Sequence, residues 1–201
     1  ALGGDGGDEL FGGYNYYRRS ALFYHYFKWM SIHFRAPISK LASLFFSKDT
    51  RGYNWIDYFG KNFKNDLPIL LNKFDNIEKT RLFKNEIEKN WIEYNYSLDD
   101  TKLNEDLQSL LTVMDFENFL PDDILVKTDR ASMMHSLEVR APFLDKDLIE
   151  FAFRKIPSSS KFTHKKTKQF LKVFSKKILP PNFDFSRKQG FEFPLGDLLK
   201  T

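Results

Sequence analysis

The sequence reads GGDGGDELFGGY over residues 3–14 and continues over residues 15–35 with the aromatic run NYYRRSALFYHYFKWMSIHFR. Six of the ten glycines fall within the first thirteen positions. In the run that follows, large apolar side chains recur every third or fourth residue, which is typical of a helix. The apolar stripe is wide, so we predict one helix over residues 15–35 that is buried on more than one side.

The remainder of the chain shows the same helical periodicity and no convincing alternation of polar and apolar residues. We predict helices over about residues 80–94, 102–119, 122–134, 145–155 and 163–179, with two short ones that start at Pro37 and near Pro194. Pro121 is expected to end one helix, with Asp122 and Asp123 in the first turn of the next. Residues 48–76 give no clear pattern. The predicted fold class is mainly α.

Composition limits the class of protein. The 201 residues are 42% apolar, which suits one domain or most of one. There is no Cys, which excludes disulfides, thiolate metal sites and a Cys nucleophile. The most apolar stretch, residues 20–34, is shorter than the roughly 20 residues that span a membrane. The net charge of +4 is too small to indicate a nucleic-acid partner. We also expect no membrane partner and a cytoplasmic location.

The C-terminal half carries a basic stretch, with nine basic residues and no acidic one over residues 151–183. We predict that Lys165, Lys168, Lys172 and Lys176 line one solvated face of an amphipathic helix. Contact with nucleic acid or another anionic surface is the alternative interpretation of this stretch.

The glycine loop combines two features that rarely suit one ligand. Its glycines let the backbone approach a ligand closely, and its amides can bind phosphate oxygens. Asp5, Asp8 and Glu9 would repel a bare phosphate, whereas an intervening Mg²⁺ would reconcile the two. The spacing fits neither GxxxxGK[ST] nor GxGxxG. The loop therefore predicts Mg-nucleotide or Mg-pyrophosphate binding, with a flexible solvated turn as the equally simple alternative on composition alone.

Three further blocks accompany the loop. They are LPDDILVKTDRASM at residues 120–133, SLEVRAPFLD at 136–145, and RKQGF at 187–191 followed by Pro194 and Leu195. In order and spacing the four segments resemble the synthetase domain of glutamine-dependent asparagine synthetases. The resemblance implies an α/β domain of the adenine-nucleotide α-hydrolase-like, PP-loop ATP pyrophosphatase type, of which residues 1–201 would be the helical C-terminal portion.

This resemblance implies an ATP-dependent ligase that adenylates a carboxylate, most simply that of aspartate, and releases pyrophosphate. Ammonia from glutamine then attacks the acyl carbon, which gives asparagine and AMP. ATP and Mg²⁺ are the implied cofactors. Carried over by position, the roles are catalysis for Asp5 and Lys188, backbone contacts with ATP for Gly3, Gly4 and Gly6, and Mg²⁺ ligation for Asp8.

Five further charged residues of the matching blocks are second-tier candidates: Glu9, Asp129, Arg130, Glu138 and Arg140. For the last four, buried ion pairs and helix caps that shape the site wall are the favoured interpretation, because an unpaired buried charge is costly. Direct contact with a substrate is the alternative.

The chain also departs from the family pattern. Gly3 replaces the usual Ser and Asp5 the usual Glu, so another carboxylate, such as one on a sugar or metabolite, stays open as the acceptor. The SGGxDS loop and the glutaminase domain are absent from the sequence, so we expect part of a longer enzyme that is inactive by itself. Its implied partner is the glutaminase domain of the same full-length chain, and a homodimer stays open. A non-catalytic helical binding module is the competing class.

Overall fold

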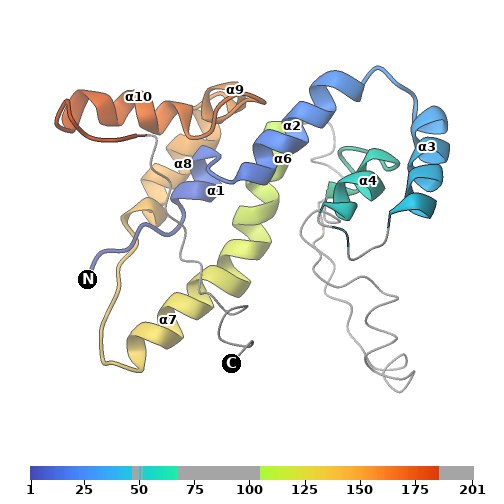
Figure 1. Ribbon diagram of the computed structural model, residues 1–201. Helices are drawn as coiled ribbons and strands as arrows, with labels where there is room; N and C mark the ends of the chain where they lie inside the picture. Colours follow the sequence, from blue (N-terminus) through green and yellow to red (C-terminus); the bar gives the residue numbers. More distant parts are fainter. Residues whose placement is uncertain (47–49, 51, 68–104, 186–201) are drawn as a thin grey trace.

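The computed structural model describes residues 1–46, 50, 52–67 and 105–185 (Figure 1). The described elements are α1 (Gly7–Phe11), α2 (Asn15–Phe27), α3 (Ile32–Phe45), α4 (Tyr53–Phe59), α6 (Leu107–Met114), the π-helix η3 (Asp115–Leu125), α7 (Val126–Met133), the 3-10 helix η4 (Pro142–Leu144), α8 (Lys146–Arg154), α9 (Ser158–Lys161) and α10 (Gln169–Ile178). The mainly helical prediction is confirmed for these residues, in which strand-like pairing is limited to one parallel bridge between Leu2 and Arg140. The helices predicted at 80–94 and near Pro194 lie outside them.

A continuous rod formed by α6, η3 and α7 runs diagonally through the molecule (Figure 1). It begins at Asp106, whose carboxylate accepts a hydrogen bond of 2.8 Å from the Ser109 amide. The break predicted at Pro121 is wrong, because Pro121 lies inside the π-helical segment. Proline lacks an N–H and crowds the preceding α-helical turn. The wider π-type turns relieve that crowding, so the helix continues through the proline.

The single helix predicted over residues 15–35 is also wrong, because α2 ends at Phe27 and α3 starts at Ile32. Ser31 caps α3 by accepting a hydrogen bond of 3.3 Å from the amide of His33. Pro37, predicted to open a helix, instead lies within α3. The capping serine, and not the proline, therefore sets the start of this helix.

Burial of this region differs from the prediction as well. In α2 only Tyr17, Ser20 and Ala21 are buried. Trp29 and Phe34 are 76% and 71% exposed. The apolar stripe therefore lies at the surface over much of its length, and the prediction of burial on more than one side is wrong.

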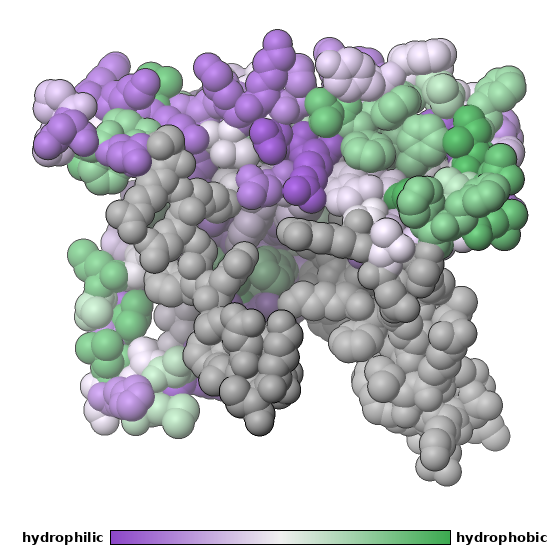
Figure 2. Space-filling model, in the orientation of Figure 1, coloured by the Kyte–Doolittle hydropathy of each residue, from purple (hydrophilic) through white to green (hydrophobic). Residues whose placement is uncertain are grey.

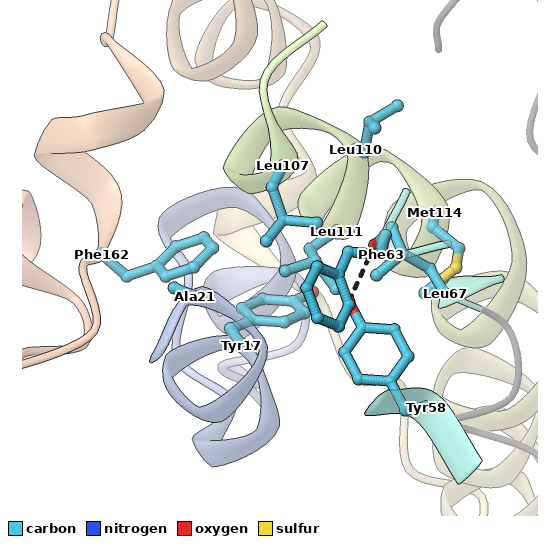
Figure 3. Packing of buried hydrophobic residues seen from close by; sticks show 10 residues of the cluster. All are labelled: Tyr17, Ala21, Tyr58, Phe63, Leu67, Leu107, Leu110, Leu111, Met114 and Phe162. Carbon is cyan, nitrogen blue, oxygen red and sulfur yellow. Dashed lines mark hydrogen bonds between the residues drawn. The ribbon is translucent and has the colours of Figure 1, made fainter. Parts of the chain in front are cut away.

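Two apolar cores hold the helices together. The first joins α2, α4 and α6 to Phe162, and it contains Tyr17, Ala21, Tyr58, Phe63, Leu67, Leu107, Leu110, Leu111, Met114 and Phe162 (Figure 3). The second lies between α1 and α8 and contains Leu10, Phe11, Ala152 and Ile156. Because α1 belongs to the second core and α2 to the first, the segment between these two helices is fixed at both ends.

Arg35 fastens α3 to α4. Arg35 is 6% exposed, and its guanidinium donates hydrogen bonds of 2.7 and 2.9 Å to the carbonyls of Phe59 and Lys61. The same group lies 3.8 Å from the centre of the Phe63 ring. Ser39 adds a bond of 2.7 Å to the carbonyl of Ile56. The α3–α4 pair is therefore joined by polar bonds rather than by a large apolar contact.

The opposite side of α3 carries apolar side chains that face outward. Five large apolar side chains are between 49% and 80% exposed, namely Ile38, Leu41, Leu44, Phe45 and Phe46. Figure 2 shows hydrophobic groups gathered at the end of the molecule where α3 lies. We call these five residues the α3 apolar face. None of the described helices is both long enough and apolar enough to cross a membrane.

The helices predicted at 145–155 and 163–179 are both found, the second with a later start. The helix predicted at 145–155 is confirmed as α8, which Asp145 caps through the amides of Asp147 and Leu148. The helix predicted at 163–179 starts six residues late, because residues 163–168 form a loop. Its end is as predicted, with α10 stopping at Ile178 before Pro180 and Pro181.

Candidate active site around the glycine loop

The glycine loop is held by close packing as well as by its own conformation. Gly6 and Gly12 have φ values of 87° and 71°, which disfavour any side chain. A Cβ at Gly6 would lie 2.4 Å from Leu144, and one at Gly12 would lie 2.2 Å from Phe162. The flexible-turn alternative therefore does not describe this loop, whose glycines allow neighbouring side chains to pack against the backbone.

An ion pair closes over the end of the loop. The Lys168 Nζ lies 2.6 Å from Asp8 Oδ1, and both side chains are about one-third exposed. The amide of Lys168 donates a hydrogen bond of 3.2 Å to the carbonyl of Gly12. A Cβ at Gly13 would lie 1.6 Å from Asp8 Oδ1 and 2.3 Å from the Lys168 Cε. The pair therefore occupies the space that the missing Gly13 side chain leaves.

Lys168 has a backbone that is unusual for its residue type. It sits in the left-handed region, with φ 51° and ψ 37°, immediately before α10. Such conformations are uncommon in non-glycine residues and cluster at functional sites. The prediction that Lys168 lies on a solvated helical face is wrong. Sequence periodicity did not reveal the loop at residues 163–168, because the helical pattern of α10 extends back to residue 163 in the sequence.

Asp5 lies in a pocket formed with residues of the sequence blocks at 120–133 and 136–145. The amide of Gly3 donates a hydrogen bond of 2.8 Å to the Arg140 carbonyl, which sets residues 1–3 beside 138–140. The pocket has a volume of about 320 Å³, and its charged lining residues are Asp5, Asp129, Glu138 and Arg140. The fold thus gathers three of the second-tier candidates around a predicted catalytic carboxylate.

Burial of these charges does not follow the favoured interpretation. Glu138 and Arg140 form an ion pair, but their side chains are 70% and 76% exposed. Asp129 and Arg130 are exposed too, because α7 has no buried residue. The buried ion pairs predicted here are therefore wrong. Arg130 does not line the pocket.

The three glycines predicted to contact ATP lie in different surroundings. The Gly3 amide is engaged by Arg140, and Gly6 is buried beneath Leu144. Gly4 is exposed, and a Cβ there would meet nothing within 4 Å. Their contact with ATP stays a prediction, with Gly4 the one most open to a ligand. Lys188 lies outside the described residues.

A buried carboxylate follows Asp8 directly. Glu9 is 1% exposed and accepts a hydrogen bond from the Tyr14 hydroxyl, which ties the two ends of the loop together. Burial raises the pKa of Glu9, and the bond from Tyr14 offsets part of that rise. Glu9 therefore acts inside the loop rather than at its open face.

A second buried carboxylate, which the sequence analysis missed, lies behind the loop. Asp115 is fully buried and accepts hydrogen bonds from the hydroxyls of Tyr16 and Tyr17, the latter at 2.6 Å. Burial raises the pKa of Asp115 to about 7, against the lowering effect of the two tyrosine bonds. No motif pointed to Asp115, because it sits within an apolar helical run.

The donors around Asp8 suit one kind of metal site only. In the part of the chain that the structure describes, no three His, Cys, Asp or Glu side chains are grouped to hold a metal ion. Asp8 supplies a single carboxylate beside the Lys168 ammonium. Mg²⁺ is commonly bound by one or two carboxylates together with substrate phosphates, and the ammonium would face those phosphates. Among the described residues, the donor set at Asp8 therefore fits a Mg-phosphate group better than a metal ion held by protein alone.

Comparison with known proteins identifies the family of the chain. The whole chain, residues 1–201, matches the family model described as Asparagine synthase. The chain belongs to the asparagine synthase family. The resemblance drawn from the four sequence blocks is thereby confirmed.

Individual relatives of the asparagine synthase family cover different parts of the chain. Asparagine synthetase (glutamine-hydrolyzing) 1 of Bacillus subtilis (strain 168) is 30% identical over 212 residues, which cover 100% of this chain and 32% of the relative. Putative asparagine synthetases (glutamine-hydrolyzing) of Mycobacterium bovis and Mycobacterium tuberculosis are 36% identical over 88 residues, 44% of this chain and 13% of theirs. No solved structure gives a significant match. The chain thus spans about a third of the length of the Bacillus subtilis relative.

Proposed function

We propose that this chain forms part of an ATP-dependent ligase that activates a carboxylate as an acyl-adenylate and transfers it to ammonia. The observation that carries the proposal is the Asp8–Lys168 ion pair, which lies three residues along the loop from the pocket around Asp5. A cation-binding carboxylate, a phosphate-binding ammonium and a charged pocket are the groups that adenylation needs in one place. Membership of the asparagine synthase family supports the amide-forming class.

The Asp8–Lys168 end of the site would handle pyrophosphate. Asp8 would turn from Lys168 to a Mg²⁺ ion, and the freed ammonium would face a phosphate oxygen. When bound, Mg²⁺ would neutralise charge on the leaving pyrophosphate. Gly13 has no side chain to obstruct this exchange of partners, since any Cβ there would collide with both groups.

The pocket around Asp5 would take the acceptor. Its volume of about 320 Å³ suits a small metabolite rather than a nucleotide. Arg140 can pair with a substrate carboxylate in place of Glu138, while Glu138 and Asp129 can accept hydrogen bonds from an ammonium group. This mixture of one cation and several anions favours a small amino acid, so we propose aspartate over an acceptor without an amino group. Asp5 would face the carbonyl carbon that ammonia attacks.

The other parts of the reaction rest on the full-length protein. The names of the relatives describe glutamine-hydrolyzing enzymes, and we propose that a glutaminase domain of the same protein supplies the ammonia. We also propose that the described helices pack on a PP-loop α/β portion that completes the ATP site.

Acceptor-dependent release of pyrophosphate from ATP tests the proposal in the full-length protein. With aspartate and ammonia we expect steady release, which Asp5→Asn lowers by about 10²-fold, the loss typical of one electrostatic contact to a transition state. Asp57→Asn, a carboxylate change on α4 at the other end of the molecule, is the matched control (Figure 1). If a sugar carboxylate stimulated pyrophosphate release and aspartate did not, the protein would instead be a related amidotransferase. Failure of aspartate and all other carboxylates to stimulate release would refute the ligase.

A further inference from the structure

The three tyrosines that follow the glycine loop are all anchored by buried carboxylates. Tyr14 donates its hydroxyl proton to Glu9, while Tyr16 and Tyr17 donate theirs to Asp115. Their rings also pack on one another, with centroids of Tyr16 and Tyr17 4.7 Å apart. The first turn of α2 is therefore fixed by both its hydroxyls and its rings.

The burial of the Asp115 carboxylate is not explained by a gain in folding stability. It is fully buried, and among the described residues no cation lies within ion-pair distance of it. Its Oδ1 has no hydrogen-bond partner in that part of the chain. Burying a carboxylate that is only partly satisfied costs free energy, and a well-packed apolar residue is often more stable. A buried polar group of this kind is better explained by the geometry that it enforces.

The geometry in question is that of the candidate site. Gly13 immediately precedes the anchored turn, and its backbone abuts both Asp8 and Lys168. The amide of Gly13 also donates a hydrogen bond of 2.8 Å to the Asp8 carbonyl, so a shift of the Gly13 backbone would be passed on to Asp8. Tyr16 and Tyr17 lie only three and four residues further along. The position of Asp115 in the rod is thus transmitted to the loop over a short stretch of fixed backbone.

We propose that Asp115 is a positioning residue that sets the place of the Asp8–Lys168 pair through the hydroxyls of Tyr16 and Tyr17. The ligand of the pair, Mg-pyrophosphate, is taken from the proposed function. The way in which the pair is held in place is inferred from the contacts alone. Asp115 touches neither substrate nor metal in this role. It acts by fixing the end of the loop against α6 and η3.

The test compares three variants of the full-length protein. Asp115→Asn removes the charged acceptor, and Tyr17→Phe removes one donor but keeps the ring. Tyr58→Phe is the matched control, because Tyr58 lies in the same core and donates a buried hydrogen bond of 2.8 Å to the Phe63 carbonyl. Each variant is measured for Mg-pyrophosphate affinity by calorimetry, for amide hydrogen exchange of residues 8–14, and for melting temperature.

We expect Asp115→Asn and Tyr17→Phe to weaken Mg-pyrophosphate affinity at least about tenfold, since an ångström of misplacement can cost 10²-fold. Both should also accelerate exchange at residues 8–14. Tyr58→Phe should lower the melting temperature and change neither. Lower melting temperatures in all three, with affinity and loop exchange as in Tyr58→Phe, would overturn the proposal.

Two further outcomes stay informative. If Asp115→Asn fails to fold, Tyr17→Phe decides by itself, because it preserves the packing of the ring. If the unmodified protein does not bind Mg-pyrophosphate, the proposed function fails. The exchange of residues 8–14 then still decides whether Asp115 holds the loop.

Discussion

At the scale of single residues, Lys168 combines a charge with a strained backbone, and the two can be separated. Asn tolerates the left-handed conformation better than most residues, so Lys168→Asn removes the ammonium while keeping the φ of 51° accessible. In the full-length protein we expect pyrophosphate release to fall by about 10²-fold, with little change in melting temperature. Lys165→Asn, in the same loop, is the control. Equal rates for the two variants would show that the Lys168 charge has no role.

A second prediction at this scale concerns pH. Burial raises the pKa of Asp115 to about 7 in the folded chain, above the ordinary value of 3.8. The folded state therefore holds this proton more tightly than the unfolded state does. The resulting contribution of Asp115 to the free energy of unfolding is fully present below about pH 4 and is lost as the pH rises through 7. Relative to Asp115→Asn, the free energy of unfolding should fall over that window and level off above it. Chemical denaturation at a series of pH values measures the difference, and a pH-independent difference would contradict it.

At the scale of elements, Arg35 is the fastening between α3 and α4. Arg35→Met keeps the length of the side chain but removes its hydrogen bonds to Met30, Phe59 and Lys61. We expect a loss of about 2–4 kcal/mol in the free energy of unfolding, because bonds from a charged donor contribute about 1.5–3 kcal/mol each and are not fully additive. Denaturant titration against Arg18→Met, at an exposed position of α2, provides the comparison. Equal stability of the two variants would show that the hydrogen bonds of Arg35 do not stabilise the α3–α4 pair.

The elements also show what sequence can and cannot predict. Helix α8 was predictable because Asp145 is a strong cap, and the end of α10 because two prolines follow it. The continuity of the rod through Pro121 was not, because π-type turns depend on tertiary packing. Asp5 and Asp8 were identified by a local motif, whereas Lys168 joins Asp8 from the far end of the described chain. Contacts between distant segments leave no periodic signal.

At the scale of the whole molecule, the 201 residues should bind MgATP poorly by themselves. The chain spans 32% of the length of its Bacillus subtilis relative, and the pocket around Asp5 is about 320 Å³. A site divided between segments loses most of its converging contacts when one is missing. Calorimetry with MgATP should therefore show no binding in the micromolar range for this chain, and micromolar binding would contradict a divided site.

The α3 apolar face should make the protein prone to self-association in solution. Five large apolar side chains presented side by side form a surface that salting-out ions drive together and that fluorescent hydrophobic dyes adsorb to. Light scattering of the chain should therefore rise with concentration and with ammonium sulfate. Leu44→Glu, which places a charge at a position 80% exposed, should suppress that rise without lowering the melting temperature. Val173→Glu, exposed on α10 and away from this face, should leave it unchanged.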